Sequence, residues 1–221
     1  FIFPNSRIFK ILLSILLLAK EIILSSESVV LSFQANLYAI LISKIFNTKI
    51  IIRANASPSG WANDSLKKNI FKWLLKYPKA IIVNSVDFKE EMKKKFNVKS
   101  ECIFNPLNKL NILKKSKNKI INKVYKKKQS LKLINIGRLV DQKDHMTLLK
   151  AIKLIHLNTN IELLIIGRGE NEKIIKNFII NNQLKKSVKI MNFKINPFPY
   201  IKKCDALVLS SKYEGLPNVL L

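Results

Sequence analysis

The sequence predicts an α/β protein with two doubly wound domains in tandem, each built around a parallel sheet. Three observations predict this class: short apolar runs alternate with segments of helical period, the alternation occurs twice, and a highly charged stretch without a clear period separates the two series. Parallel strands require crossover segments, so this alternation indicates parallel sheets covered by helices on both faces. We expect a first domain over 1–107, a linker or solvated helix over 108–130 and a second domain over 131–221.

The first series opens with an apolar stretch at 8–24. Two lysines and a glutamate bracket its uninterrupted apolar run, which is shorter than the ~20 residues that a membrane span needs. A buried or half-buried helix is therefore favoured over a helix that lies in a membrane surface. Asp87 and Glu90 predict a capping box for a later helix. Strands are predicted at 28–33, 48–53, 80–85 and 100–106, and further helices at 35–46, 65–77 and 88–96.

The second series has the same alternation. Strands are predicted at 131–137, 161–167, 187–193 and 205–210, and helices at 144–157, 171–182 and 197–204. The chain begins at Phe1 and ends at Leu221 inside an apparent helix start, for which Pro217 suits the first turn. We therefore expect an internal piece of a longer protein, with both predicted domains incomplete.

The net charge of +26 favours anionic partners. The lysines occur with abundant isoleucine and asparagine and with only 5 glycines, a pattern expected from codon bias, so solvated surface is the favoured interpretation, with an anionic membrane face as the alternative. No aromatic or zinc pattern of a nucleic-acid-binding protein is visible, so no nucleic-acid partner is expected. Cys102 and Cys204 suit buried free thiols in a reducing compartment, and two histidines exclude a His-rich metal site.

Candidate ligand-binding residues follow the predicted strands of the second domain. Ligands bind open parallel sheets at the carboxyl ends of the strands, beside helix N-termini. There Gly137 allows a tight turn, and Arg138 and Lys143 offer a rigid fork and a mobile charge that suit a diphosphate. The alternative is two solvated cations in a lysine-rich chain.

Two further loops lie at the same predicted edge. Gly167 and Gly169 in "GRGEN" permit close backbone approach to a ligand, although a GxG pattern alone is weak evidence. Glu214 follows the last strand, where its carboxylate can accept hydrogen bonds from hydroxyl groups. The alternative for Glu214 is a helix-start carboxylate favoured by the helix dipole.

Three motifs together, "NIGRLVDQKDH", "LLIIGRGE" and "ALVLSSKYEGLPNVLL", resemble the carboxyl-terminal domain of family four glycosyltransferases. They occur in the order of that family, and first-domain stretches such as "AIIVNSVDFKEEMKKKF" and "CIFNPLN" resemble its amino-terminal half. The resemblance covers nearly the whole chain. It implies the GT-B fold of two Rossmann-like domains, with a sugar nucleotide held mainly by the second and an acceptor by the first.

The resemblance also implies roles for the candidate residues. Arg138 and Lys143 would hold the donor diphosphate without a metal or other cofactor, consistent with the lack of a DxD motif. Glu214 would be the first glutamate of an E-x7-E motif and lie near the sugar hydroxyls. The backbone of four residues would line the sugar and diphosphate: Gly215, Leu216, Pro217 and Asn218. The second glutamate would follow Leu221, so the chain alone is expected to be inactive.

The expected function is transfer of a sugar, with retention, from a nucleotide-sugar donor, most simply UDP-linked, to a glycan or lipid-linked acceptor in cell-surface polysaccharide biosynthesis. A cytoplasmic enzyme, peripheral on the inner face of the plasma membrane, fits this expectation. Two alternatives stay open: a sugar-nucleotide epimerase of similar fold, and a basic module that binds membranes or nucleic acid. Arg53 and Asn55 either face the acceptor or only end a strand and cap a turn.

Overall fold

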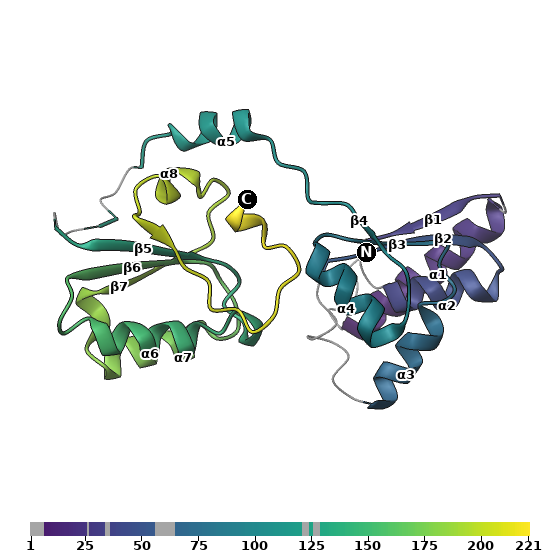
Figure 1. Ribbon diagram of the computed structural model, residues 1–221, viewed down its shortest axis with the longest axis horizontal. Coiled ribbons are helices and arrows are strands. Elements are labelled where there is room, and N and C mark those ends of the chain that lie inside the picture. Colours follow the sequence, from purple (N-terminus) through teal and green to yellow (C-terminus); the bar gives the residue numbers. More distant parts are fainter. Residues whose placement is uncertain (1–6, 26, 34–35, 56–64, 121–123, 126–128) are drawn as a thin grey trace. The chain divides into compact units, whose positions relative to one another are not determined.

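The computed structural model describes residues 7–25, 27–33, 36–55, 65–120, 124–125 and 129–221 (Figure 1). The chain divides into two compact units. The first comprises Phe1–Asn105 with Glu214–Leu216, and the second comprises Pro106–Tyr213 with Pro217–Leu221.

A four-stranded parallel sheet with the order β1-β2-β3-β4 forms the frame of the first unit. Its strands are β1 (Val29–Ser32), β2 (Lys49–Ala54), β3 (Ala80–Val83) and β4 (Glu101–Cys102). The helices α1 (Arg7–Leu24), α2 (Asn36–Ile45), α3 (Ser65–Leu74) and α4 (Val86–Phe96) connect or precede them. Each of these strands and helices lies within or overlaps a segment that the sequence predicts to have the same type.

All four helices of the first unit pack on one face of its sheet, as Figure 1 shows. Ile50 and Ile52 of β2 meet this helical layer, in which Phe88 and Phe96 of α4 are buried. On the opposite face Leu31 is 54% exposed, so the expectation of helices on both faces is wrong for the described part of this unit. The strand order explains the difference, because right-handed crossovers between strands in sequential order all fall on one side.

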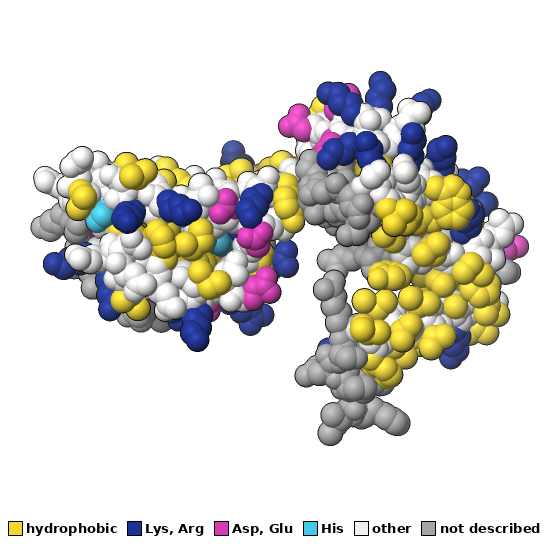
Figure 2. Space-filling model, turned by 90° about the horizontal axis from the view of Figure 1, so that it is seen from below, with side chains coloured by type: hydrophobic (Ala, Val, Ile, Leu, Met, Phe, Trp, Pro, Cys, Tyr) yellow, Lys and Arg dark blue, Asp and Glu magenta, His cyan; other side chains and the backbone are white. Residues whose placement is uncertain are grey.

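The first helix is more exposed than the sequence predicts. Leu18 packs against the core and Ile22 is buried. Large apolar side chains nevertheless face outward along its length: Ile8, Phe9, Leu12, Leu16, Leu17, Ile23 and Leu24. Figure 2 shows hydrophobic side chains gathered on one face of this unit. Within the described ranges, no helix combines the length and the apolar character that a membrane crossing requires.

The cap of α4 differs from the predicted capping box. Ser85 is the N-cap residue, and its hydroxyl accepts a hydrogen bond from the Phe88 amide at 3.2 Å. Asp87 therefore lies inside the first turn, where a carboxylate still favours the positive end of the helix dipole. The helix therefore begins two residues earlier than predicted, at Val86, and the predicted capping residue is wrong.

A second four-stranded parallel sheet, with the order β7-β6-β5-β8, forms the frame of the second unit. Its strands are β5 (Leu131–Ile136), β6 (Ile161–Ile166), β7 (Val188–Met191) and β8 (Ala206–Leu207). Its helices are α5 (Lys109–Ser116), α6 (His145–Ile155), α7 (Glu172–Asn181) and α8 (Phe198–Ile201), with short 3-10 turns at Asp141–Lys143, Leu184–Lys186 and Asn218–Leu220.

Both faces of this second sheet are covered, as the sequence predicts. Helices α6 and α7 pack on one face, and α8 lies with α5 on the other (Figure 1). The charged stretch from 108 to 130 contains α5 and contributes Val124, which is buried against Ile134 and Leu164. The Tyr125 hydroxyl also donates a hydrogen bond to the Leu133 carbonyl at 3.1 Å.

Candidate functional site

The strand order of the second unit reverses direction at β5. The chain runs from β5 outward through β6 to β7, and then returns through α8 to place β8 on the other side of β5. A crevice outside the carboxyl ends of two such strands is the usual ligand site of an open α/β sheet. The loops at 137–144 and 208–213, which follow β5 and β8, are therefore the candidate site.

Hydrogen bonds tie these two loops together. The Ser210 hydroxyl lies 3.0 Å from the Lys143 carbonyl oxygen and 2.9 Å from that of Asp144. The Lys212 amide donates to the Gln142 carbonyl at 2.9 Å, and the Gln142 side-chain amide donates to the Tyr213 carbonyl at 3.0 Å. These hydrogen bonds hold the loop after β5 and the loop after β8 against each other.

An ion pair adds to this connection at the surface. The Lys212 ammonium lies 2.8 Å from an Asp141 carboxylate oxygen. The hydrogen bond to Asp141 raises the pKa of Lys212, so the ammonium group stays charged near neutrality. Such an exposed pair contributes little to stability, and its effect is mainly on the direction of the two side chains.

The glycines of the "GRGEN" loop are explained by packing between backbones. A Cβ atom at Gly167 would lie 1.9 Å from the Gly137 carbonyl oxygen, and one at Gly169 would lie 2.4 Å from the Leu139 carbonyl oxygen. The Leu139 amide also donates to the Arg168 carbonyl at 3.0 Å. Gly167 and Gly169 thus hold this loop against the loop after β5, and their roles toward a ligand stay predictions.

The structure brings three predicted residues to the carboxyl end of β5. The Lys143 side chain runs along the backbone of Gly137, because a Cβ atom there would lie 3.5 Å from both Lys143 Cδ and Cε. Lys143 is half-buried, whereas the neighbouring Arg138 is exposed. The roles of these two cationic side chains toward an anion stay predictions.

The third predicted loop is divided between the units. Glu214, Gly215 and Leu216 group with the first unit, while Pro217 and Asn218 group with the second. Pro217 has an extended backbone and precedes the final 3-10 turn, so it lies just before the first turn and not inside it as predicted. Asn218 lines a 700 Å³ apolar cavity of the second unit, together with Ile136, Leu207 and residues of α5 and α8.

Ser210 and Gln142 are site residues that the sequence interpretation missed. Serine and glutamine beside a strand end are common and carry no spacing signal. Their positions are the one signal that could have found them, because Gln142 follows β5 and Ser210 follows β8.

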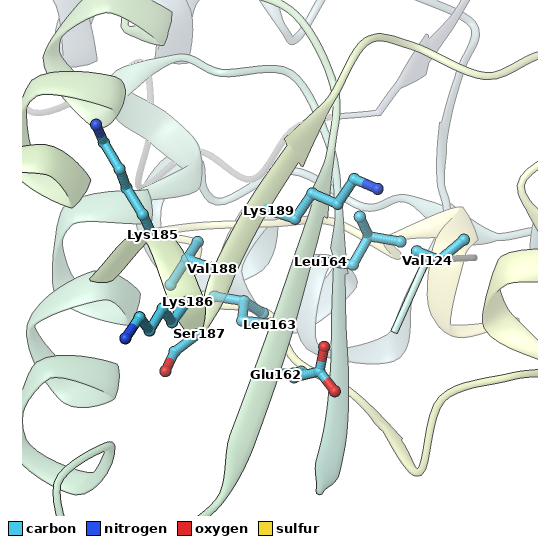
Figure 3. A pocket seen from close by; sticks show the side chains of 9 residues that line it. All are labelled: Val124, Glu162, Leu163, Leu164, Lys185, Lys186, Ser187, Val188 and Lys189. Atoms are coloured by element: carbon cyan, nitrogen blue, oxygen red, sulfur yellow. The ribbon is translucent and has the colours of Figure 1, made fainter. Parts of the chain in front are cut away.

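A different pocket of about 400 Å³ lies at the amino ends of β6 and β7 (Figure 3). Glu162 is buried there and accepts a hydrogen bond from the Ser130 hydroxyl at 2.7 Å. Figure 3 shows Lys185 and Lys186 pointing away from Glu162, while Lys189 extends past Leu164. This pocket is at the opposite end of the strands from the predicted diphosphate site and does not include its residues.

His145 is the buried polar residue closest in sequence to the candidate site. It is 2% exposed, and neither ring nitrogen has a hydrogen-bond partner among the residues that the structure describes. Asp144, the N-cap of α6, precedes it with φ 44° and accepts a hydrogen bond from the Thr147 amide at 3.3 Å. Burial, with the nearby Lys143 charge, lowers the pKa of His145 and keeps its imidazole neutral.

We expect His145 to make stability depend on pH. The unfolded chain binds this proton at the ordinary pKa of about 6.5, while the folded chain binds it only at lower pH. The free energy of unfolding should therefore fall as the pH drops below about 6.5 and level off only below the lowered pKa. Urea unfolding near pH 7.5 and pH 5.5 measures this effect.

His145→Phe should lose less stability on acidification than the wild type does, because the variant has no buried group to protonate. His156→Phe is the matched control, since His156 is half-exposed and already bonds the Lys153 carbonyl. Equal acid sensitivity in the wild type and the His145 variant would contradict the assignment of this effect to His145.

Among the described residues, no group of three or more histidines, cysteines, aspartates or glutamates is placed to hold a metal ion. Metal-independent action remains a prediction from the motifs.

Residues 116–221 match the family model described as "Glycosyl transferases group 1". This part of the chain therefore belongs to the group 1 glycosyl transferase family, and the resemblance drawn from the three motifs is confirmed. The match includes every residue predicted to hold the donor.

Curated proteins align over more of the chain. It is 30% identical over 195 residues to an uncharacterized glycosyltransferase of Methanocaldococcus jannaschii, covering 82% of this chain and 48% of that protein. It is 28% identical over 194 residues to the Campylobacter jejuni N-acetylgalactosamine-N,N'-diacetylbacillosaminyl-diphospho-undecaprenol 4-alpha-N-acetylgalactosaminyltransferase, covering 83% of this chain and 51% of that protein. The chain thus spans about half the length of these relatives.

Solved structures agree on the fold. HepE of Anabaena, solved with UDP-glucose, has a TM-score of 0.68 at 16% identity. The match covers 92% of this chain and 59% of the HepE chain. TarM has a TM-score of 0.67 at 17% identity, and the match covers 91% of this chain and 40% of the TarM chain. The predicted α/β GT-B fold class is therefore confirmed.

Proposed function

We propose that this chain is the donor-binding and acceptor-side part of a glycosyltransferase that uses a nucleotide-sugar donor, with UDP as the nucleotide. The observation that carries the proposal is the position of Lys143 along the Gly137 backbone, beside Arg138, in the loop that follows β5 next to β8. Family membership of residues 116–221 supports the reaction class. Support for UDP is that HepE, a structure of similar fold, was solved with UDP-glucose.

In this proposal Arg138 and Lys143 bind the donor diphosphate and stabilise the negative charge that develops as it leaves. Fixed cations and dipoles act strongly on such charge because they need no reorganisation during the reaction. Glu214 accepts hydrogen bonds from the sugar hydroxyls, and the backbone from Gly215 to Asn218 lines the sugar. The chemistry is metal-independent, and positioning of the two substrates supplies the remaining acceleration.

The acceptor in this proposal is a glycan or a lipid-linked glycan precursor in cell-surface polysaccharide biosynthesis, and the sugar is transferred with retention. The Campylobacter relative supports a lipid-linked acceptor, because its name specifies a diphospho-undecaprenol-linked sugar. A Staphylococcus aureus relative, 32% identical over 105 residues, is described as a capsular polysaccharide biosynthesis glycosyltransferase. Retention rests on the resemblance to family four.

Thermal unfolding with and without UDP tests the donor site. At about one hundred times its dissociation constant UDP should add roughly 2.7 kcal/mol to the stability of the unit that binds it. Arg138→Ala should remove most of this gain because the diphosphate loses its bidentate partner. Lys189→Ala is the matched control, since Lys189 is an exposed cation at the opposite end of the strands.

Equal stabilisation of the wild type and Arg138→Ala by UDP would remove Arg138 from the donor site. If no nucleoside diphosphate stabilises the chain, the transferase proposal loses its main support. A basic module would instead bind polyanions with a steep loss of affinity on adding salt and would be indifferent to Arg138→Ala alone.

A further inference from the structure

Arg53 lies at the carboxyl end of β2, an interior strand of the first sheet. It is the penultimate residue of the strand and is half-buried. Holding a guanidinium partly out of water costs free energy unless its N–H groups are bonded and its charge is balanced. Its partners therefore indicate whether the side chain only supports the fold.

Neutral oxygens hold this guanidinium in place. Arg53 Nη2 donates to the Ile103 carbonyl at 3.1 Å and to Asn105 Oδ1 at 2.8 Å, both just beyond β4. Arg53 Nε donates to Asn55 Oδ1 at 3.3 Å. These bonds fix the plane of the guanidinium at the carboxyl edge of the sheet.

The backbone beneath it is fixed as well. Asn36 Nδ2 donates to the Arg53 carbonyl at 3.1 Å, and the Ser32 hydroxyl donates to Asn36 Oδ1 at 2.7 Å. Asn55 Nδ2 donates to the Phe33 carbonyl at 3.2 Å. The arginine thus stands in a network that includes residues following β1, β2 and β4.

The positive charge of Arg53 has no carboxylate partner in the part of the chain that the structure describes. Nη1, with two N–H groups, makes no hydrogen bond to any described residue. Neutral groups fix this guanidinium, its charge is not balanced by a described carboxylate, and Nη1 keeps two N–H donors. Such a group can make a bidentate contact with an anion.

Exposed apolar side chains flank this charge. Phe33 is 53% exposed, Ile103 is 50% exposed and Phe104 is 60% exposed. Phe33 and Ile103 each contribute a backbone carbonyl to the network around Arg53. An anion attached to a hydrocarbon chain fits such a surface better than a free anion does.

We propose that Arg53 binds the diphosphate group of a lipid-linked acceptor. The proposal that an anion binds here rests on the hydrogen bonds of Arg53. Its assignment to the acceptor rests on the proposed transferase function, for which the second unit holds the donor diphosphate.

The response of the Arg53 Nε–H signal in ¹H–¹⁵N NMR spectra tests this site in the full 221-residue chain. Inorganic pyrophosphate should shift that signal on titration. Farnesyl diphosphate should bind at least about tenfold more tightly than pyrophosphate, because its chain covers exposed apolar surface. If neither anion moves the Arg53 signal, the site is overturned; if pyrophosphate binds as tightly as farnesyl diphosphate, the lipid assignment is overturned.

Asn105→Asp separates anion binding from support of the fold. An aspartate keeps the hydrogen-bond acceptor for Arg53 Nη2 and places a negative charge beside the guanidinium. This ion pair offsets the loss of the 3.4 Å hydrogen bond from Asn105 Nδ2 to the Leu216 carbonyl, so we expect the variant to fold. It should nevertheless bind pyrophosphate at least about tenfold more weakly, because the guanidinium is then neutralised. Unchanged affinity in this variant would overturn the proposal.

Arg168→Gln is the matched arginine control. Arg168 lies in the second unit, 5.9 Å from the centre of the Phe193 ring, and its loss should leave the Arg53 response unchanged. A failure of UDP to stabilise the chain, with a normal Arg53 response, would overturn the donor function and leave the anion site. The reverse result would overturn only the anion site.

Discussion

Gly167→Ala should destabilise the second unit by about 3 kcal/mol or more, since overpacking against a backbone atom cannot be relieved by a rotamer change. The new Cβ atom would lie 1.9 Å from the Gly137 carbonyl oxygen and 3.4 Å from Leu139 Cδ2. The loops after β5 and β6 would have to separate, which also deforms the candidate donor crevice. Hydrogen exchange of the β6 amides, which belong to the central sheet, measures the loss.

Gly137→Ala is the matched control for this prediction. The nearest atoms to a Cβ atom at Gly137 would belong to the Lys143 side chain, at 3.5 Å, which is an ordinary contact distance. We expect this variant to stay within about 1 kcal/mol of the wild type. Similar losses for both variants would show that the close approach of Gly167 to Gly137 does not determine the stability of the unit.

Phe96→Ala should cost the first unit about 3–5 kcal/mol, the usual range for truncating a fully buried phenylalanine. Phe96 is 0% exposed at the end of α4, and its ring lies 6.2 Å from that of Phe71 on α3. Its removal leaves a cavity between these helices and the sheet. Tryptophan fluorescence during urea unfolding measures the change, because Trp73 lies on α3 of the first unit.

Phe46→Ala serves as the control of the same residue type. Phe46 follows α2 and is 40% exposed, so its truncation should cost only about 1 kcal/mol. Stabilisation of the second unit by UDP should persist in Phe96→Ala if the units fold on separate cores. Comparable destabilisation by the two phenylalanine variants would contradict the core described for the first unit.

The alternation of apolar runs and helical periods predicted the strands and the helices well, because buried parallel strands leave a strong local signal. The β6 segment is an example, with all six residues buried. The order of the strands has no local signal. The one-sided first sheet follows from that order, and the prediction of helices on both faces failed there for this reason.

The sequence predicts the cationic residues of the candidate site, but it does not predict the residues that hold its loops together. Arg138 and Lys143 stood out because charged residues directly followed a buried strand. Ser210 and Gln142 act through backbone oxygens of another loop, a contact that only the fold creates. The glycines were noticed as allowing close approach to a ligand, whereas the structure shows close approach between two loops.

The place of β8 beside β5 has a consequence for how the second unit folds. Asn135 and Val208, joined by a 2.8 Å hydrogen bond, are 73 residues apart in the sequence. Contacts of such sequence separation require closure of a long loop and slow the folding of a domain. During synthesis β8 emerges after β5, β6 and β7. Nucleotide binding by a growing chain would therefore report that β8 has paired with β5.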